Sequence, residues 1–243
     1  MSKISRSFAA ASLLAALSFH PTAATAATGE NLDISLCAPG DNAFSLTIDN
    51  PYFPLLPGRV SVFSGEEEGE SLGLEITVTK GTERFYPGSA NFRTRVVQEL
   101  EWGDANGDGA IDDGEDLIEV SQNYFAQTQD GTVCYFGEVV DIYEDGQVVS
   151  HAGTWRADDP GNAPGIFMPA TPKKGQHWQI ESAPGIAQDE ATIVGVRTVT
   201  VPAGRFRKAL EVADCNPLDG DCGTKFYAPQ RGLIADNGLL LLP

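Results

Sequence analysis

The sequence contains few histidines and no common catalytic motif. Of three histidines, only His151 and His177 lie beyond the first 26 residues. There is no H-E-x-x-H zinc motif or phosphate-binding glycine loop. His151 continues a strand-like segment, and His177 precedes Trp178 in a proline-rich stretch, where it is a candidate pocket residue. Because a lone histidine is more often a packing or surface residue, no catalytic residue is assigned.

Basic residues are scarce as well. The chain has 16 Lys and Arg against 34 Asp and Glu, a formal net charge of −18. Such a protein repels nucleic acid and anionic membrane surfaces. We therefore expect no nucleic-acid partner, and we expect most carboxylates to serve only solubility.

Long apolar runs are missing, so no membrane insertion is expected. Residues 1–26 are typical of a signal peptide: Lys3 and Arg6 precede an apolar stretch from Phe8 to Leu17, and Ala24-Thr25-Ala26 offers a cleavage site. An unprocessed N-terminal helix is the alternative. Cleavage would leave residues 27–243 as the mature chain, with a formal charge of −20, because residues 1–26 hold two basic and no acidic residues. This chain is expected to be periplasmic or secreted.

Cysteine is limited to four residues, without the C-x-x-C spacing of common zinc sites. An even count in an exported chain predicts disulfides. Cys215 and Cys222 bracket a turn-rich segment, and this pairing would leave Cys37 for Cys134. Three connectivities are open, and this one is preferred.

Beyond residue 26 the sequence has no long amphipathic helix, internal repeat or flexible linker. Leu74, Ile76 and Val78 alternate with polar residues, as in a half-buried strand. Similar short segments are "RVSVF", "NFRTRVV", "DLIEVSQNYF", "TVCYF", "VVDIY", "QVVSH", "VRTVTV" and "TKFYA". Tight turns such as Asp145-Gly146 and Asn237-Gly238 separate several of them. These features predict an all-β chain with one domain, 27–243: an antiparallel meander forming a β-barrel, part-barrel or sandwich.

The stretch from Ala157 to Glu190 departs from this pattern, because it contains five prolines. Proline cannot donate the hydrogen bonds of a central strand, so a long irregular loop is predicted. Such a loop would border a pocket at a barrel mouth or pack across the barrel end as a rigid connector. Met168, His177 and Trp178 are the candidate pocket residues.

One loop has the spacing of a calcium ligand set. In "DANGDGAIDDGE", the ligand positions one, three, five, seven, nine and twelve hold Asp104, Asn106, Asp108, Ala110, Asp112 and Glu115. Ala110 would offer its carbonyl and Glu115 both carboxylate oxygens, while Gly109 permits the sharp turn and Ile111 would anchor the loop. These twelve residues resemble the EF-hand calcium loop and predict Ca²⁺ as a cofactor. A solvated acidic turn that binds nothing strongly is the alternative.

The flanks of this loop do not resemble an EF-hand. Gly103 stands where an entering helix would still be turning, and "DLIEVSQNYF" after the loop favours a strand. A calcium-loop hairpin, strand–loop–strand, is therefore predicted. Without a pair of helices the sensor mechanism of calmodulin is not expected, so calcium would stabilise the fold without switching it.

A second resemblance covers most of the mature chain. It rests on the segments "NPYFPLLPG", "YFAQTQDGTVCYFG", "GIFMPA", "APGIA", "VPAGRF" and "YAPQRGLI". These are similar to recurring segments in a family of exported bacterial β-proteins of unassigned activity. Members carry a short hairpin in place of the acidic loop, which implies that calcium is accessory to the fold. The resemblance implies no catalytic residues.

Two classes of function remain after these exclusions. The first is a non-catalytic, exported calcium-binding β-protein whose barrel holds a small apolar or amphipathic ligand. The second is a secreted hydrolase or lyase that uses carboxylates together with His177. A cavity lined by apolar and aromatic residues would favour the first class, and a cleft with a buried carboxylate near His177 would favour the second. Because no catalytic motif is present, the first is preferred.

Overall fold

The computed structural model describes residues 29–40, 43–67, 69–88 and 90–243. The predicted signal peptide, 1–26, lies outside them. The described chain is antiparallel β-structure with one short 3-10 helix, η1 (Ile34–Cys37). The strands are β1 (Val60–Glu67), β2 (Glu70–Phe85), β3 (Phe92–Gly103), β4 (Leu117–Gln127), β5 (Val133–Glu144), β6 (Gln147–Ser150), β7 (Trp155–Arg156), β8 (Ala163–Met168), β9 (His177–Gln179), β10 (Glu181–Ser182), β11 (Glu190–Val201), β12 (Gly204–Cys215), β13 (Cys222–Ala228), β14 (Gly232–Asp236) and β15 (Leu239–Leu241).

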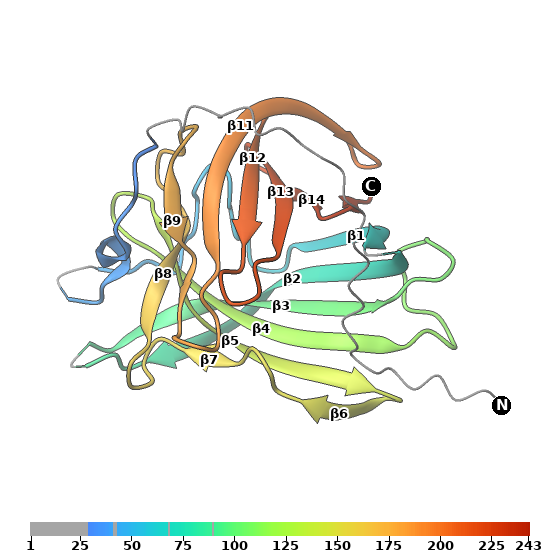
Figure 1. Ribbon diagram of the computed structural model, residues 1–243, viewed down its shortest axis with the longest axis horizontal. Coiled ribbons are helices and arrows are strands. Elements are labelled where there is room, and N and C mark those ends of the chain that lie inside the picture. Colours follow the sequence, from blue (N-terminus) through green and yellow to red (C-terminus); the bar gives the residue numbers. More distant parts are fainter. Residues whose placement is uncertain (1–28, 41–42, 68, 89) are drawn as a thin grey trace, which may run out of the picture.

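Two meanders form most of a nearly closed barrel, which confirms the predicted fold class. Strands β1 to β5 pair in chain order, as do β11 to β15, and β15 pairs with β1. On the other side of the barrel β5 pairs with β8, β8 with β10, and β9 with β11. Strands β6 and β7 pair only with β5. In Figure 1, β11–β13 run at a steep angle to β2–β5.

Alternating residues and positive-φ turns account for these strands. On β2, Leu74 and Val78 are buried, whereas Glu75 between them is more accessible. The predicted hairpin turns are confirmed at Asp145-Gly146 and Asn237-Gly238, where all four residues have positive φ. Residues of this type reach such angles at low cost, so the local sequence fixes these hairpins.

The predicted irregular loop between Ala157 and Glu190 was wrong, because this stretch contains β8, β9 and β10. Pro164 lies at the second position of β8, opposite Glu181. Its missing N–H is tolerated at the start of this short strand, and the β5 pairing uses the residues after it. The segment 177–182 pairs with β11 through its first half and with β8 through its second. The proline-rich stretch therefore closes the barrel.

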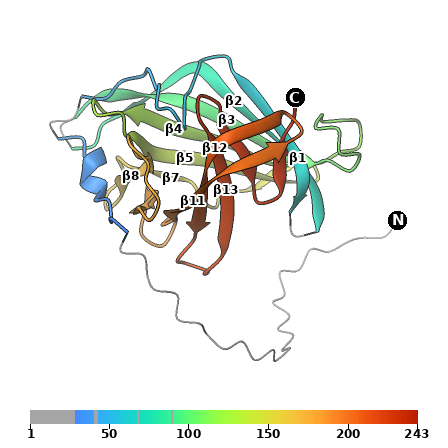
Figure 2. The ribbon, with the colours of Figure 1, turned by 90° about the horizontal axis from the view of Figure 1, so that it is seen from above.

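Both preferred disulfides are confirmed. Cys37–Cys134 joins η1 to β5, and Cys215–Cys222 links facing positions of β12 and β13. The described residues contain no free cysteine. Figures 1 and 2 both place η1 and the loop between β3 and β4 at opposite ends of the molecule. Within the described residues, no helix is long and apolar enough to cross a membrane.

Candidate functional site: the barrel cavity and the acidic loop

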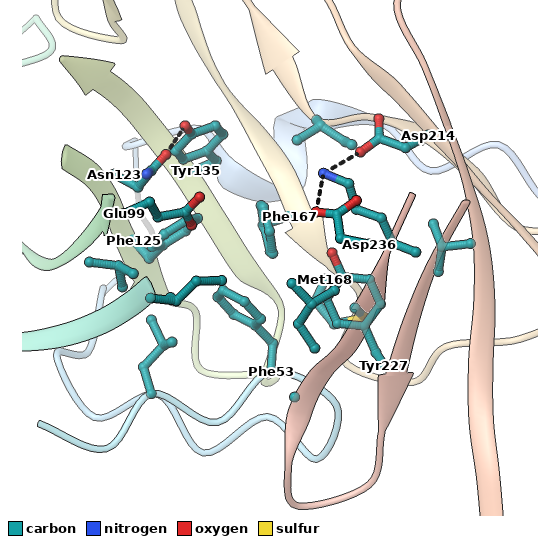
Figure 3. A pocket seen from close by; sticks show the side chains of 18 of the residues that line it. Phe53, Glu99, Asn123, Phe125, Tyr135, Phe167, Met168, Asp214, Tyr227 and Asp236 are labelled. Carbon is teal, nitrogen blue, oxygen red and sulfur yellow. Dashed lines mark hydrogen bonds and ion pairs between the residues drawn. The ribbon is translucent and has the colours of Figure 1, made fainter. Parts of the chain in front are cut away.

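The barrel encloses a cavity of about 250 Å³. One part of its wall is aromatic and apolar (Figure 3). Phe53, from the loop before β1, lies 4.3 Å from Phe167 of β8 and 5.2 Å from Phe125 of β4, measured between ring centroids. Met168 and the fully buried Trp178 also line the cavity. The volume lies just below the roughly 300 to 1,000 Å³ of typical small-molecule sites.

The remaining wall carries six carboxyl groups from six different segments. These are Glu99 (β3), Glu138 (β5), Glu181 (β10), Asp189 (before β11), Asp214 (β12) and Asp236 (β14). The lining has three basic residues, Arg59, Lys225 and Arg231. Carboxyl groups therefore outnumber basic groups around the cavity by two to one.

Burial strongly perturbs several of these carboxyl groups. It raises the pKa of Glu138 to about 8, with further contributions from the charges of Glu181 and Glu99. Burial and the charge of Asp189 raise the pKa of Glu181 to about 8. The pKa of Glu99 rises to about 7, again mainly through burial, and that of Asp189 to about 6. At neutral pH the wall consequently holds a mixture of protonated and ionised groups.

Lys225 is the partner of two of the aspartates. Its Nζ lies 3.0 Å from Oδ2 of Asp214 and 3.6 Å from Oδ2 of Asp236. Burial favours the neutral amine, but the charges of Asp236 and Asp214 outweigh it and hold the pKa of Lys225 well above its usual value. Figure 3 shows Asp214 and Asp236 of this triad on the side of the cavity opposite Glu99. The triad leaves Glu99, Glu138, Glu181 and Asp189 without an ion pair within the described residues.

Some buried polar atoms at the cavity have no hydrogen-bond partner in the described part of the chain. They are Nε1 of Trp178 and the Oδ1 atoms of Asp214 and Asp236. By contrast, Tyr135 donates its hydroxyl proton to Oδ1 of Asn123, and Nδ2 of Asn123 donates to Oγ of Ser121 at 3.1 Å. Buried polar atoms in native proteins nearly always find a partner, so unpartnered ones beside a cavity indicate a place for a polar ligand group.

The three candidate pocket residues lie in different surroundings. Met168 and Trp178 line the cavity, but His177 does not. Its Nδ1 lies 2.9 Å from Oγ1 of Thr192 and its Nε2 3.4 Å from Oε2 of Glu190, with 38% of the side chain exposed. Successive side chains of a strand point to opposite faces, so the buried Trp178 directs His177 outward. A cavity reaction that uses His177 therefore has no geometric support.

The acidic loop follows β3 and precedes β4, which confirms the strand–loop–strand arrangement. Asp104 is fully buried and accepts hydrogen bonds from Gly107 N, from Gly109 N and, at 2.6 Å, from Oγ of Ser64. At the other end, Glu115 accepts from Ala105 N and Asp112 N, both at 3.0 Å. The first and last predicted ligands thus fold the loop into a closed ring.

The inner members of the ligand set contact one another. Nδ2 of Asn106 donates to Oδ2 of Asp112 at 2.8 Å and to Oδ2 of Asp108 at 3.3 Å. Oxygen ligands are those that Ca²⁺ prefers, so the donor set fits this ion chemically. Among the described residues, however, no three Asp, Glu, His or Cys side chains converge as metal ligands. Calcium binding at these positions therefore stays a prediction.

The predicted anchoring of the loop through Ile111 was wrong, since this side chain is 50% exposed. The neighbouring Ala110 carbonyl instead accepts a hydrogen bond from Nε1 of the buried Trp102 at 3.1 Å. Gly109 has φ +74°, and a Cβ there would lie 2.3 Å from Cδ1 of Leu242. Glycine is thus required both for the turn and for close contact with the C-terminal segment.

Sequence reasoning did not find the carboxyl cluster of the cavity. Its six members come from distant segments, and the chain has 34 acidic residues from which to choose. The strand alternation that directs Leu74, Ile76 and Val78 inward offered one signal. Applied to β3, it would have placed Glu99 on the same inward face as the buried Val97.

Comparison with known proteins adds little to this picture. No family model matches the chain, and no curated protein matches it. Among solved structures it is similar to a Bacteroides fragilis protein described as exported and as having a YmcC-like fold. The match has 16% sequence identity and a TM-score of 0.37, and it covers 78% of this chain and 94% of the other.

Proposed function

We propose that this chain is an exported, non-catalytic binding protein whose barrel holds a small amphipathic molecule. The cavity carries the proposal, because one wall consists of aromatic rings and the other of polar groups. Sites for small molecules combine such apolar walls with a few converging polar groups. Two disulfides fit a protein that works outside the cytoplasm.

A neutral, environment-sensitive dye with a polar end, such as prodan, tests this function. We expect saturable binding and a blue-shifted emission with the full mature chain. Phe53→Ala removes a ring from the cavity wall and should weaken binding at least tenfold. Leu56→Ala, an exposed residue three positions along the same loop, is the matched control and should leave binding unchanged. Absence of saturable binding, or equal effects of both substitutions, would contradict the proposal.

The second part of the proposed function is Ca²⁺ binding by Asp104, Asn106, Asp108, the Ala110 carbonyl, Asp112 and Glu115. The complete ligand spacing and the closed ring of hydrogen bonds between its two ends support it. The loop joins two strands and packs on Trp102 and Leu242, so an ion there would stabilise the end of the barrel. A stability measurement for this part is described in the Discussion.

One observation favours a second candidate, a carboxylate-dependent hydrolase. Glu181 and Asp189 line the same cavity, and burial raises their pKa values to about 8 and about 6. A proton donor beside a proton acceptor is the arrangement that acid–base hydrolysis requires. Turnover of nitrophenyl glycosides or esters that is lost in Glu181→Gln but kept in Glu144→Gln would favour this candidate. Binding without turnover would favour the first.

A further inference from the structure

The polar wall of the cavity has one side that is internally neutralised and one that is not. Lys225 lies between Asp214 and Asp236 and forms an ion pair with each of them. On the opposite side, Glu99 points into the cavity from the middle of β3 (Figure 3), and its carboxyl group forms no hydrogen bond or ion pair with the described residues. Lys225 lowers the pKa of Glu99 through its charge, yet burial still raises this pKa to about 7.

The other basic residues at the cavity, Arg59 and Arg231, have partners other than Glu99. Arg59 donates from Nη1 to the carbonyls of Pro54 and Arg231, at 3.3 and 3.2 Å. Arg231 donates from Nη1 to Oγ of Ser61 at 3.2 Å. Both arginines are thus held against β1 and the loops beside it, so neither neutralises Glu99 within the described structure.

The groups beside Glu99 suit a cation with an apolar body. Phe125 lies next to it and Phe53 nearby in Figure 3, and the faces of aromatic rings attract ammonium groups. Tyr135 donates its single hydroxyl proton to Oδ1 of Asn123, and Nδ2 of Asn123 donates to Ser121; within the described residues neither donates to Glu99. A divalent metal is disfavoured, because the described carboxylates do not converge as ligands. An anion would meet the surplus of carboxyl groups.

We propose that the cavity binds a primary ammonium ion attached to a compact aromatic or apolar body, with Glu99 as its counter-ion and Phe53 and Phe125 against its body. This inference rests on the proposed binding function and names the ligand class. The chain's own lysine triad provides a precedent, because it already holds one ammonium group between two carboxylates inside the barrel.

Binding of an amine should be linked to proton release. The titratable and charged groups that face this space are Glu99, Tyr135, Glu138, Glu181, Asp189, Asp214, Lys225, Tyr227, Asp236, Arg59 and Arg231. Burial raises the pKa of Glu99 to about 7, and those of Glu138 and Glu181 to about 8. An ammonium ion favours the ionised carboxylates, so they should lose protons on binding. Affinity for the amine should consequently increase from about pH 6 to about pH 8.

The test compares 2-phenylethylamine with its neutral isostere 2-phenylethanol and with phenylacetate, by calorimetry on the full mature chain. We expect the amine to bind at least tenfold more tightly than the alcohol and phenylacetate to bind most weakly. Repeating the titration in buffers of different ionisation enthalpy measures the protons released. Glu99→Gln should remove the preference for the amine, whereas Glu144→Gln, an exposed residue at the end of β5, should preserve it.

Glu138→Gln is the second variant should Glu99→Gln fail to fold, and it should reduce the preference and the number of released protons. Equal affinities for amine and alcohol, or equal effects of Glu99→Gln and Glu144→Gln, would overturn the inference. Prodan binding by the cavity without binding of any of the three compounds would also overturn it and leave the proposed binding function standing. Failure of prodan and all three compounds to bind would reject both.

Discussion

Carboxyl groups gather in two regions of this molecule, and their surroundings differ. In the loop 104–115 the first and last acids, Asp104 and Glu115, each accept two backbone N–H groups, and the chain itself satisfies their oxygens. In the cavity, Glu99, Glu138 and Glu181 are desolvated, and burial raises their pKa values. The loop satisfies its carboxylates with its own backbone, while the barrel holds its carboxyl groups at an energetic cost.

The difference follows from how each region is built. A loop of twelve residues can direct its own backbone N–H groups at its own side chains, so its acids are accommodated locally. The N–H groups of barrel strands are committed to neighbouring strands, and interior carboxyl groups must find other partners. Lys225 fills this role for Asp214 and Asp236. Destabilising groups retained in a cavity are typical of functional sites, which is why the cavity carries the proposed function.

We expect the largest effect from removing Lys225, which pairs with Asp214 and Asp236 in the cavity wall. Lys225→Met leaves Asp214 and Asp236 largely buried without a cation. Removing one member of a buried pair is strongly destabilising, and since 29% of the lysine side chain is exposed we expect a loss of about 3 kcal/mol at neutral pH. Urea unfolding measures it. Lys80→Met, an exposed lysine of β2, should change stability by less than about 0.5 kcal/mol. Similar losses in both variants would show that the triad contributes little.

The next effect concerns the pH dependence of the desolvated carboxyl groups. The pKa of Glu138 rises from 4.5 to about 8 on folding, mainly through burial. The folded state therefore binds the proton more tightly than the unfolded state, and stability should decrease as pH rises from about 4.5 to about 8. Glu138→Gln should remove part of this decrease and be about 2 kcal/mol more stable than wild type at about pH 8. At about pH 4.5 the two proteins should be nearly equal.

Unfolding curves of Glu138→Gln and wild type across this pH range give the comparison. Glu144→Gln, on the exposed end of the same strand, is the control and should follow the wild-type profile. A wild-type stability that stays constant or increases from about pH 5 to about pH 8 would contradict the desolvation of the cavity carboxyl groups.

The two regions also differ in how far the sequence could predict them. The loop is local: its ligand spacing, its strand flanks and Gly109 are all readable in consecutive residues, and the strand–loop–strand arrangement is confirmed. Its anchor was missed, because Trp102 and Leu242 reach the loop only through the packing of the folded chain. A barrel cavity with an apolar and aromatic lining was expected from the sequence. Its carboxyl groups were not, because they come from six segments whose strand registers no local pattern specifies.

The proline-rich stretch shows the same limit. Its prolines favoured a loop, yet backbone pairing with β5 and β11 makes it the closing edge of the barrel. Trp178 turns inward to the cavity and His177 outward, a choice of face that depends on register and not on composition. Both disulfides could be predicted, because four cysteines and one short loop left few pairings.

The smallest effect tests whether the loop is an ion site at all. An extracellular loop of this type should bind Ca²⁺ with a dissociation constant on the order of 10⁻⁴ to 10⁻³ M. At tenfold excess over this constant, binding to the folded state alone adds about 1.4 kcal/mol. Glu115→Ala removes the residue that closes the ring and would ligate through both oxygens, so it should abolish most of this gain. His177→Ala, outside both the loop and the cavity lining, should keep it.

Melting curves in calcium and in chelator give the measurement. Equal midpoints for the wild type in both conditions, with no calorimetric signal at millimolar calcium, would make the loop an acidic turn held by its own backbone, and the contrast between the two regions would then be one of solvation alone.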